Sequence, residues 1–183
     1  MRKGFTLIEM LVVVTVVALI LPAVFAIVFT ILQQQAKIYS LQEVKQQGDF
    51  VLNNIRVNLK NSAISIHSAV PPTSANRVCA TTGSSFSSGQ LYFADKYNNY
   101  FWYSSDASSI ASNSSIAGAT VALTGSKVKP TSGTPLSIQC YRGATFAAPI
   151  TSISYGVTFN TTSTRPEDTT SFTYNTKVQL RNY

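Results

Sequence analysis

Residues 1–9 of the chain read MRKGFTLIE, and they lead directly into a segment without charged residues that extends from Met10 to Leu32. These 23 residues are enough for a membrane-spanning helix, which needs about 20 apolar residues. Glu9 stands at the entrance of the segment, where an ionised carboxylate costs free energy unless it has a partner. The stretch therefore predicts a membrane helix whose glutamate has a function.

The charges around the apolar segment predict its orientation. Arg2 and Lys3 precede it, and the next cationic residue is Lys37. By the positive-inside rule, we expect the short N-terminus in the cytoplasm and the C-terminal part outside. A cleavable secretory signal would have a shorter apolar core and a cleavage site of small residues, whereas residues 32–35 read LQQQ. We therefore expect the helix to stay attached.

The run KGFTLIE at residues 3–9 resembles the leader junction of type IV pilins and type II secretion pseudopilins. The resemblance implies that a membrane prepilin peptidase cuts after Gly4 and that the new first residue, Phe5, is N-methylated. It further implies that Glu9 helps to recruit and register subunits in a growing filament. After the cut, Glu9 lies near the helix N-terminus, where a neighbouring subunit's amine is a candidate partner. A simple signal anchor with a chance glutamate is the alternative.

Beyond Leu32 the apolar residues recur at helical spacing, namely at Ile38, Leu41, Val44, Gly48, Val51, Leu52, Ile55 and Leu59. This pattern predicts one helix from Phe5 to about Asn61, whose second half packs on the exported domain. Gly48 and the glutamines near it indicate softer parts of the helix. A coiled coil is the competing interpretation, but the stripe is broken at Gly48 and lacks sustained heptads.

We expect four regions: a prepilin leader (1–4), a transmembrane assembly segment (5–32), an amphipathic continuation (33–61) and a β-rich exported domain (62–183). The predicted fold class is α+β, a long N-terminal helix packed on an antiparallel sheet, as in pilins. Cys79 and Cys140 both lie in the exported part, where an oxidising compartment permits one intramolecular disulfide. Two free buried thiols are the alternative.

Alternating apolar residues predict the strands of the exported domain. Residues 90–94 and 99–104 read as an aromatic hairpin, residues 136–142 as a single strand, and residues 153–159 and 172–180 as a second hairpin. The segments 68–88 and 104–115 are expected to be irregular.

Residues suited to catalysis or metal binding are few. His67 is the only histidine, and we expect it to be a solvated residue at the helix end, because no spacing of catalytic type surrounds it. No metal site or cofactor is predicted, and the chain is not expected to be an enzyme. Glu167 and Asp168 form the best acidic pair for a calcium ion, against which stands an ordinary solvated turn.

The aromatic residues between Tyr92 and Tyr103 lie beside Lys96, an arrangement that can hold single-stranded DNA. Half the residues of a strand point inward, so core packing is the simpler interpretation of most of these rings. After Lys60 the chain has eight Lys or Arg against four Asp or Glu. This is only mildly basic and is not typical of nucleic-acid binding.

The sequence leads to the hypothesis of a structural, minor subunit of a type IV pilus or type II secretion-like pseudopilus. The segment 149–155 and the final strand, ending at residues 180–182, resemble J-type pseudopilins and W-type minor pilins. The implied partners are other pilin or pseudopilin subunits, the prepilin peptidase, the inner-membrane assembly platform and the membrane. The implied location is the cytoplasmic membrane, crossed once with the N-terminus inside, then the filament in the periplasm or at the cell surface. A filament-borne binding module for DNA or adhesion, a major pilin and an anchored domain that never polymerises are the alternatives.

Overall fold

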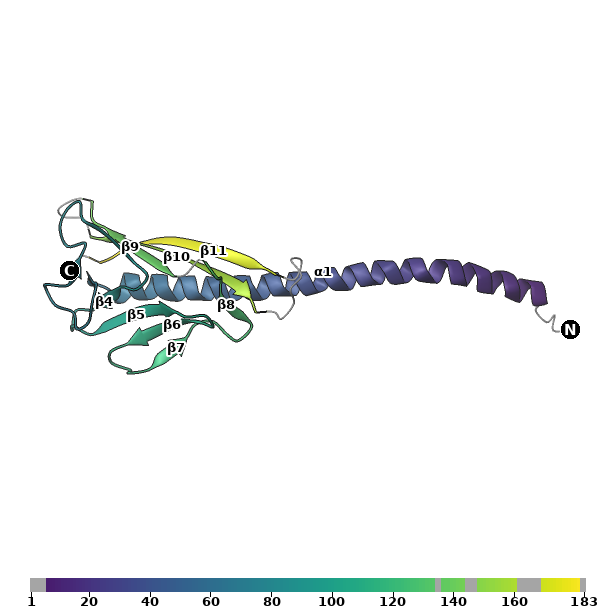
Figure 1. Cartoon of the computed structure of the whole chain (residues 1–183), viewed down its shortest axis with the longest axis horizontal. Coiled ribbons are helices and arrows are strands. Elements are labelled where there is room, and N and C mark those ends of the chain that lie inside the picture. The colour runs from purple at the N-terminus through teal and green to yellow at the C-terminus, as the bar shows by residue number, and fades with distance from the viewer. Residues whose placement is uncertain (1–5, 134–135, 144–147, 161–168, 182–183) are drawn as a thin grey trace. The chain divides into compact units, whose positions relative to one another are not determined.

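The computed structural model describes residues 6–133, 136–143, 148–160 and 169–181 (Figure 1). A helix of 56 residues, α1 (Leu7–Ser62), comes first. By its contacts the chain divides into two compact units, Met1–Tyr39 and Ser40–Tyr183, and α1 contributes to both.

The second unit contains two antiparallel sheets. Sheet A has the order β2-β1-β4-β5-β6-β7, with β1 (Ser65–His67), β2 (Arg77–Val78), β4 (Tyr92–Ala94), β5 (Tyr100–Ser105), β6 (Ile110–Ser114) and β7 (Thr120–Ala122). Sheet B has the order β11-β10-β9-β3, with β3 (Ser85–Ser88), β9 (Ser137–Tyr141), β10 (Ile150–Phe159) and β11 (Ser171–Gln179). The short β8 (Val128–Pro130) also pairs with β10.

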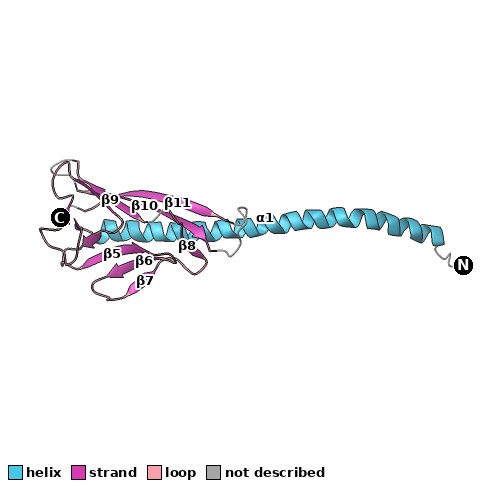
Figure 2. Cartoon of the chain, viewed as in Figure 1, coloured by secondary structure: helices cyan, strands magenta, loops and turns pink. Residues whose placement is uncertain are grey.

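One face of the C-terminal part of α1 forms the centre of this unit. Its buried residues recur every three or four positions, at Ser40, Val44, Gly48, Val51, Ile55 and Leu59. The apolar side chains among them share a core with residues of both sheets, including Phe93 and Tyr103 of sheet A and Ile138 and Val157 of sheet B. Figures 1 and 2 show the two sheets on opposite sides of this part of the helix.

Gly48 is a contact point between α1 and sheet B. The hydroxyl of Tyr155 donates a hydrogen bond of 2.8 Å to the Gly48 carbonyl, and that of Tyr174 donates one of 3.2 Å to the Lys45 carbonyl. The two tyrosine rings stack, with centroids 5.3 Å apart. The sequence suggested a softer part of the helix here. In the structure the missing side chain lets the ring of Tyr174 approach the backbone, and the softness of the helix stays a prediction.

The predicted fold class is confirmed, with two sheets where one was expected. Both predicted hairpins form, as β4–β5 and β10–β11. The prediction of irregular structure was wrong for residues 104–115, which contain β6, and for residues 68–88, which contain β2 and β3. The sequences of β3 and β6, SFSS and IASNS, are rich in serine and lack the apolar alternation that marks a half-buried strand.

Candidate functional site

The start of α1 is closed by a reciprocal pair of side chains, Thr6 and Glu9. The Thr6 backbone nitrogen and hydroxyl donate hydrogen bonds of 2.9 and 3.0 Å to Glu9 Oε2, and the Glu9 backbone nitrogen lies 3.4 Å from Thr6 Oγ1. This arrangement is a capping box, which satisfies backbone NH groups that have no partner inside the helix. The charge of Glu9 alone does not predict this cap, whereas a threonine followed three positions later by a glutamate is its sequence signal.

Only one oxygen of the Glu9 carboxylate takes part in this cap. Within the described part of the chain, Oε2 accepts both bonds from Thr6, and Oε1 has no hydrogen-bond partner. The predicted cleavage and methylation residues, Gly4 and Phe5, lie outside the described residues, so both assignments stay predictions.

The apolar side chains that follow Glu9 are exposed throughout the segment from Met10 to Leu32. α1 is the one helix in the described chain that is long and apolar enough to cross a membrane. Its hydroxyl groups are satisfied within the helix, because Thr15 Oγ1 donates to the Val12 carbonyl (2.8 Å) and Thr30 Oγ1 to the Ala26 carbonyl (2.9 Å). The segment thus presents an apolar surface without unpaired side-chain hydroxyls, as a bilayer or a helix bundle requires.

The two cysteines join the sheets. Cys79, which follows β2 of sheet A, forms a disulfide with Cys140 of β9 in sheet B, with Cα atoms 6.1 Å apart. Both residues are buried in the core. The bond therefore links the two layers on either side of α1.

The aromatic residues of β4 and β5 divide between the two faces of sheet A. Phe93 and Tyr103 are fully buried against α1. On the other face, Trp102 contacts both Tyr92 and Tyr100, with ring centroids 5.5 and 5.9 Å apart. The core interpretation therefore holds for the inward-facing rings, whereas the second set lies partly in solvent. The rings of this second set contact one another, and DNA contact here stays a prediction.

The prediction that His67 is a solvated residue at the helix end was wrong. It belongs to β1 and is only 5% exposed. Its Nε2 lies 2.8 Å from Ser65 Oγ and its Nδ1 lies 2.8 Å from Asn76 Oδ1. The helix ends at Ser62, close to its predicted end, and the chain then enters β1 of sheet A at Ser65, so His67 lies in a strand. The contact between His67 and Asn76 thus stabilises the turn after β1.

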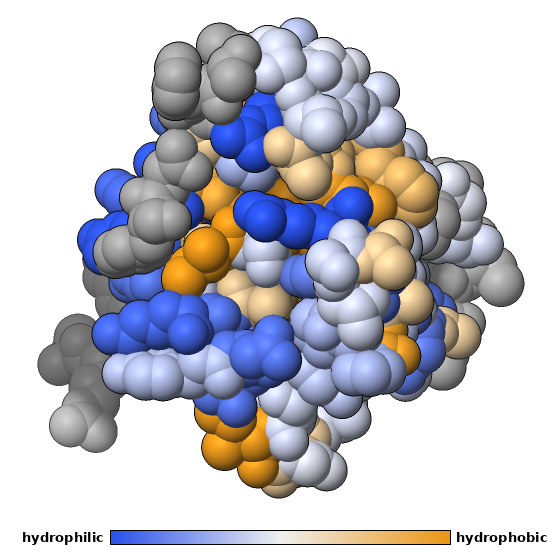
Figure 3. Space-filling model, turned by 90° about the vertical axis from the view of Figure 1, so that its left-hand side faces the viewer, coloured by the Kyte–Doolittle hydropathy of each residue, from blue (hydrophilic) through white to orange (hydrophobic). Residues whose placement is uncertain are grey.

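No group of three metal-ligating side chains occurs among the residues that the structure describes. The acidic pair Glu167 and Asp168, considered for calcium, lies outside those residues. Figure 3 views one end of the β-rich unit, where hydrophobic residues form small patches separated by polar ones. That face thus carries no continuous apolar surface among the residues coloured there.

Comparison with known proteins agrees with the N-terminal site. Residues 1–21 match the family model described as the prokaryotic N-terminal methylation motif. No curated protein and no solved structure matches the chain. The motif, together with the long apolar helix that it begins, supports the assignment of the chain to the type IV pilin and pseudopilin family.

Proposed function

We propose that the chain is a structural, minor subunit of a type IV pilus or a type II secretion-like pseudopilus. The observation that carries this proposal is the capped glutamate, Glu9, at the head of a helix whose apolar side chains from Met10 to Leu32 are exposed. The methylation motif belongs to a family of structural proteins, and we propose no catalytic activity.

The proposed life cycle begins with a membrane precursor. A prepilin peptidase cuts after Gly4, and Phe5 becomes the N-methylated first residue. The chain crosses the cytoplasmic membrane once, with Arg2 and Lys3 inside before the cut and the β-rich unit outside. An assembly platform then transfers the subunit into the filament, where neighbouring helices cover the apolar side chains that lipid covered before.

The proposed role of Glu9 follows from its two oxygens. Oε2 is held by Thr6 of the same chain, while Oε1 has no partner among the described residues. A carboxylate in an apolar environment is stabilised by an opposite charge. The cationic N-terminal amine of a neighbouring subunit is a suitable partner for Oε1. Thr6 would then orient the carboxylate for this contact.

Two substitutions of Glu9 distinguish its role in capping the helix from the role of its charge. Glutamine also serves in a capping box, so Glu9→Gln keeps the bond to the Thr6 nitrogen but removes the charge, and Glu9→Ala removes both. We expect both variants to insert into the membrane and neither to enter sheared filaments or cross-linked pseudopili. Normal incorporation of Glu9→Gln would contradict pairing with an amine, and normal incorporation of Glu9→Ala would contradict the assembly role of Glu9.

A further inference from the structure

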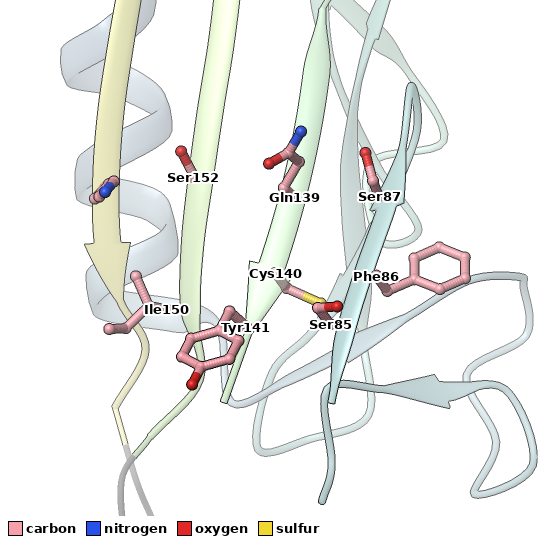
Figure 4. A pocket seen from close by; sticks show the side chains of 9 residues that line it. Ser85, Phe86, Ser87, Gln139, Cys140, Tyr141, Ile150 and Ser152 are labelled. Carbon is pink, nitrogen blue, oxygen red and sulfur yellow. The ribbon is translucent and has the colours of Figure 1, made fainter. Parts of the chain in front are cut away.

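The outward face of sheet B contains a hollow of about 520 Å³. Four strands, β3, β9, β10 and β11, line it (Figure 4). Cys140 of β9 faces inward to its disulfide, so its neighbours Gln139 and Tyr141 face outward by the alternation of a strand. The volume lies within the range of sites for small ligands, about 300–1,000 Å³.

A row of polar side chains crosses the hollow. The strand register aligns Ser87 with Gln139, Gln139 with Ser152, and Ser152 with Lys177. Figure 4 shows Ser87, Gln139 and Ser152 side by side on adjacent strands. Three inter-strand spacings give the row a length of about 14 Å. It offers hydroxyl groups and an amide, which both donate and accept hydrogen bonds, and an ammonium group, which only donates.

An apolar surface adjoins this row. Tyr141 is 50% exposed and pairs with Ile150, which is 38% exposed. Figure 4 shows both side chains beside the polar row, whereas Phe86 points away from it. Gly143 lies close to the tyrosine ring, since a β-carbon built there would be 3.4 Å from it.

The base of the hollow is rigid. Ile138 and Ile153, on the opposite face of β9 and β10, are fully buried. The disulfide at Cys140 ties β9 to the segment that follows β2. The polar row is thus carried by a packed sheet, so a ligand would have to order its side chains but not its backbone.

We propose that this hollow binds a glycan. A sugar ring has apolar C–H groups, which fit against Tyr141, and hydroxyl groups at its edges, which match the serines and Gln139. A nucleic acid would require several cations for its phosphates, and among the described residues that line the hollow Lys177 alone is cationic. An apolar peptide would leave the hydroxyl and amide groups unpaired. This binding goes beyond the proposed function and is independent of filament assembly.

The test uses the full chain in nanodiscs of phosphocholine lipids, because sugar-based detergents would compete for the site. Binding of a neutral chitooligosaccharide and of a uronate oligosaccharide is titrated by calorimetry. The variants are Tyr141→Ala, Lys177→Gln and the control Tyr97→Ala, which removes another exposed tyrosine (73%) outside the hollow. Circular dichroism checks that each variant is folded.

We expect saturable binding of at least one oligosaccharide, weakened about tenfold or more by Tyr141→Ala and unchanged by Tyr97→Ala. Weakening of uronate binding alone by Lys177→Gln would identify an acidic glycan, and no effect of this variant would identify a neutral one. Absence of saturable binding to both oligosaccharides would overturn the proposal. Unchanged affinity in folded Tyr141→Ala, or equal weakening by Tyr97→Ala, would also overturn it. The same holds if single-stranded DNA binds more tightly than the sugar and displaces it.

Discussion

The ring of Tyr174 lies where a β-carbon on Gly48 would stand, and its hydroxyl donates a 3.2 Å hydrogen bond to the Lys45 carbonyl one turn earlier in α1. β11 thus approaches the helix closely at one position. The contact explains why a glycine occupies a helix interior, where alanine is favoured by about 1 kcal/mol.

From this contact we predict that Gly48→Ala lowers the free energy of unfolding when Tyr174 is present and raises it when Tyr174 is removed. In the wild-type background, overpacking against the ring of Tyr174 lowers stability by about 1–3 kcal/mol, which outweighs the gain in helix propensity. In the Tyr174→Ala background, we expect the same substitution to stabilise the chain by about 1 kcal/mol. A double-mutant cycle of denaturant unfolding measures the coupling. Additive effects would contradict the close approach.

Buried tyrosines predict a loss of stability at alkaline pH. Burial raises the pKa of Tyr103 to about 12, although the hydrogen bond from the Asn58 amide opposes the shift. An unfolded tyrosine titrates near pH 10. The contribution of Tyr103 is therefore complete below about pH 10 and is lost as the pH rises to about 12.

Unfolding free energy measured between pH 9 and 12 tests this shift in pKa. Tyr103→Phe should flatten the decline, whereas Tyr97→Phe, at a tyrosine that is 73% exposed, should leave it unchanged. Equal slopes for wild type and Tyr103→Phe would count against the shift. Burial also raises the pKa of Tyr155, together with repulsion from Tyr174 and Asp49, so some decline should persist in the variant.

The disulfide predicts redox-dependent stability. Cys79 and Cys140 close a loop with a sequence separation of 61 residues, and such bonds typically contribute about 2–4 kcal/mol. Unfolding under reducing conditions, or of the double variant Cys79→Ser and Cys140→Ser, should show a loss of this size. Full stability of the reduced protein would mean that the core holds the two sheets together without the bond.

We predict that the outer face of α1 in the β-rich unit contacts neighbouring subunits in the filament. Phe50 is 55% exposed and Val57 is 44% exposed, and residues seven apart lie on one helix face. The double variant Phe50→Ser and Val57→Ser should fold but enter filaments less efficiently. The control is Val121→Ser, at a valine of β7 that is 57% exposed. Immunoblots of sheared filaments measure incorporation, and equal recovery of both variants would exclude this face from assembly.

The sequence predicted those parts of the fold that periodicity controls. The helix, the stripe from Val44 to Leu59 and the long hairpin β10–β11 follow from spacings of three to four or of two residues. Strands such as β6, with its serines and Asn113, were missed because they lack apolar alternation, although β6 pairs with the neighbouring strand β5. The position of His67 was missed because a strand as short as β1 leaves no clear pattern in the sequence, and the contact with Asn76 forms only once the turn has folded. At the N-terminal site, the pairing of Thr6 with Glu9 could have been read from their spacing alone.

Mass spectrometry of the mature N-terminus tests whether the chain is processed as a pilin precursor. The protein is purified from the membranes of cells with an active prepilin peptidase and compared with the Gly4→Val variant, in which a β-branched residue replaces the glycine at the cleavage site. We expect the wild-type chain to begin at Phe5 and to carry one methyl group on its amine, while the variant begins at Met1. A wild-type protein that still begins at Met1 would contradict processing after Gly4 and with it the assignment as a pilin-like subunit.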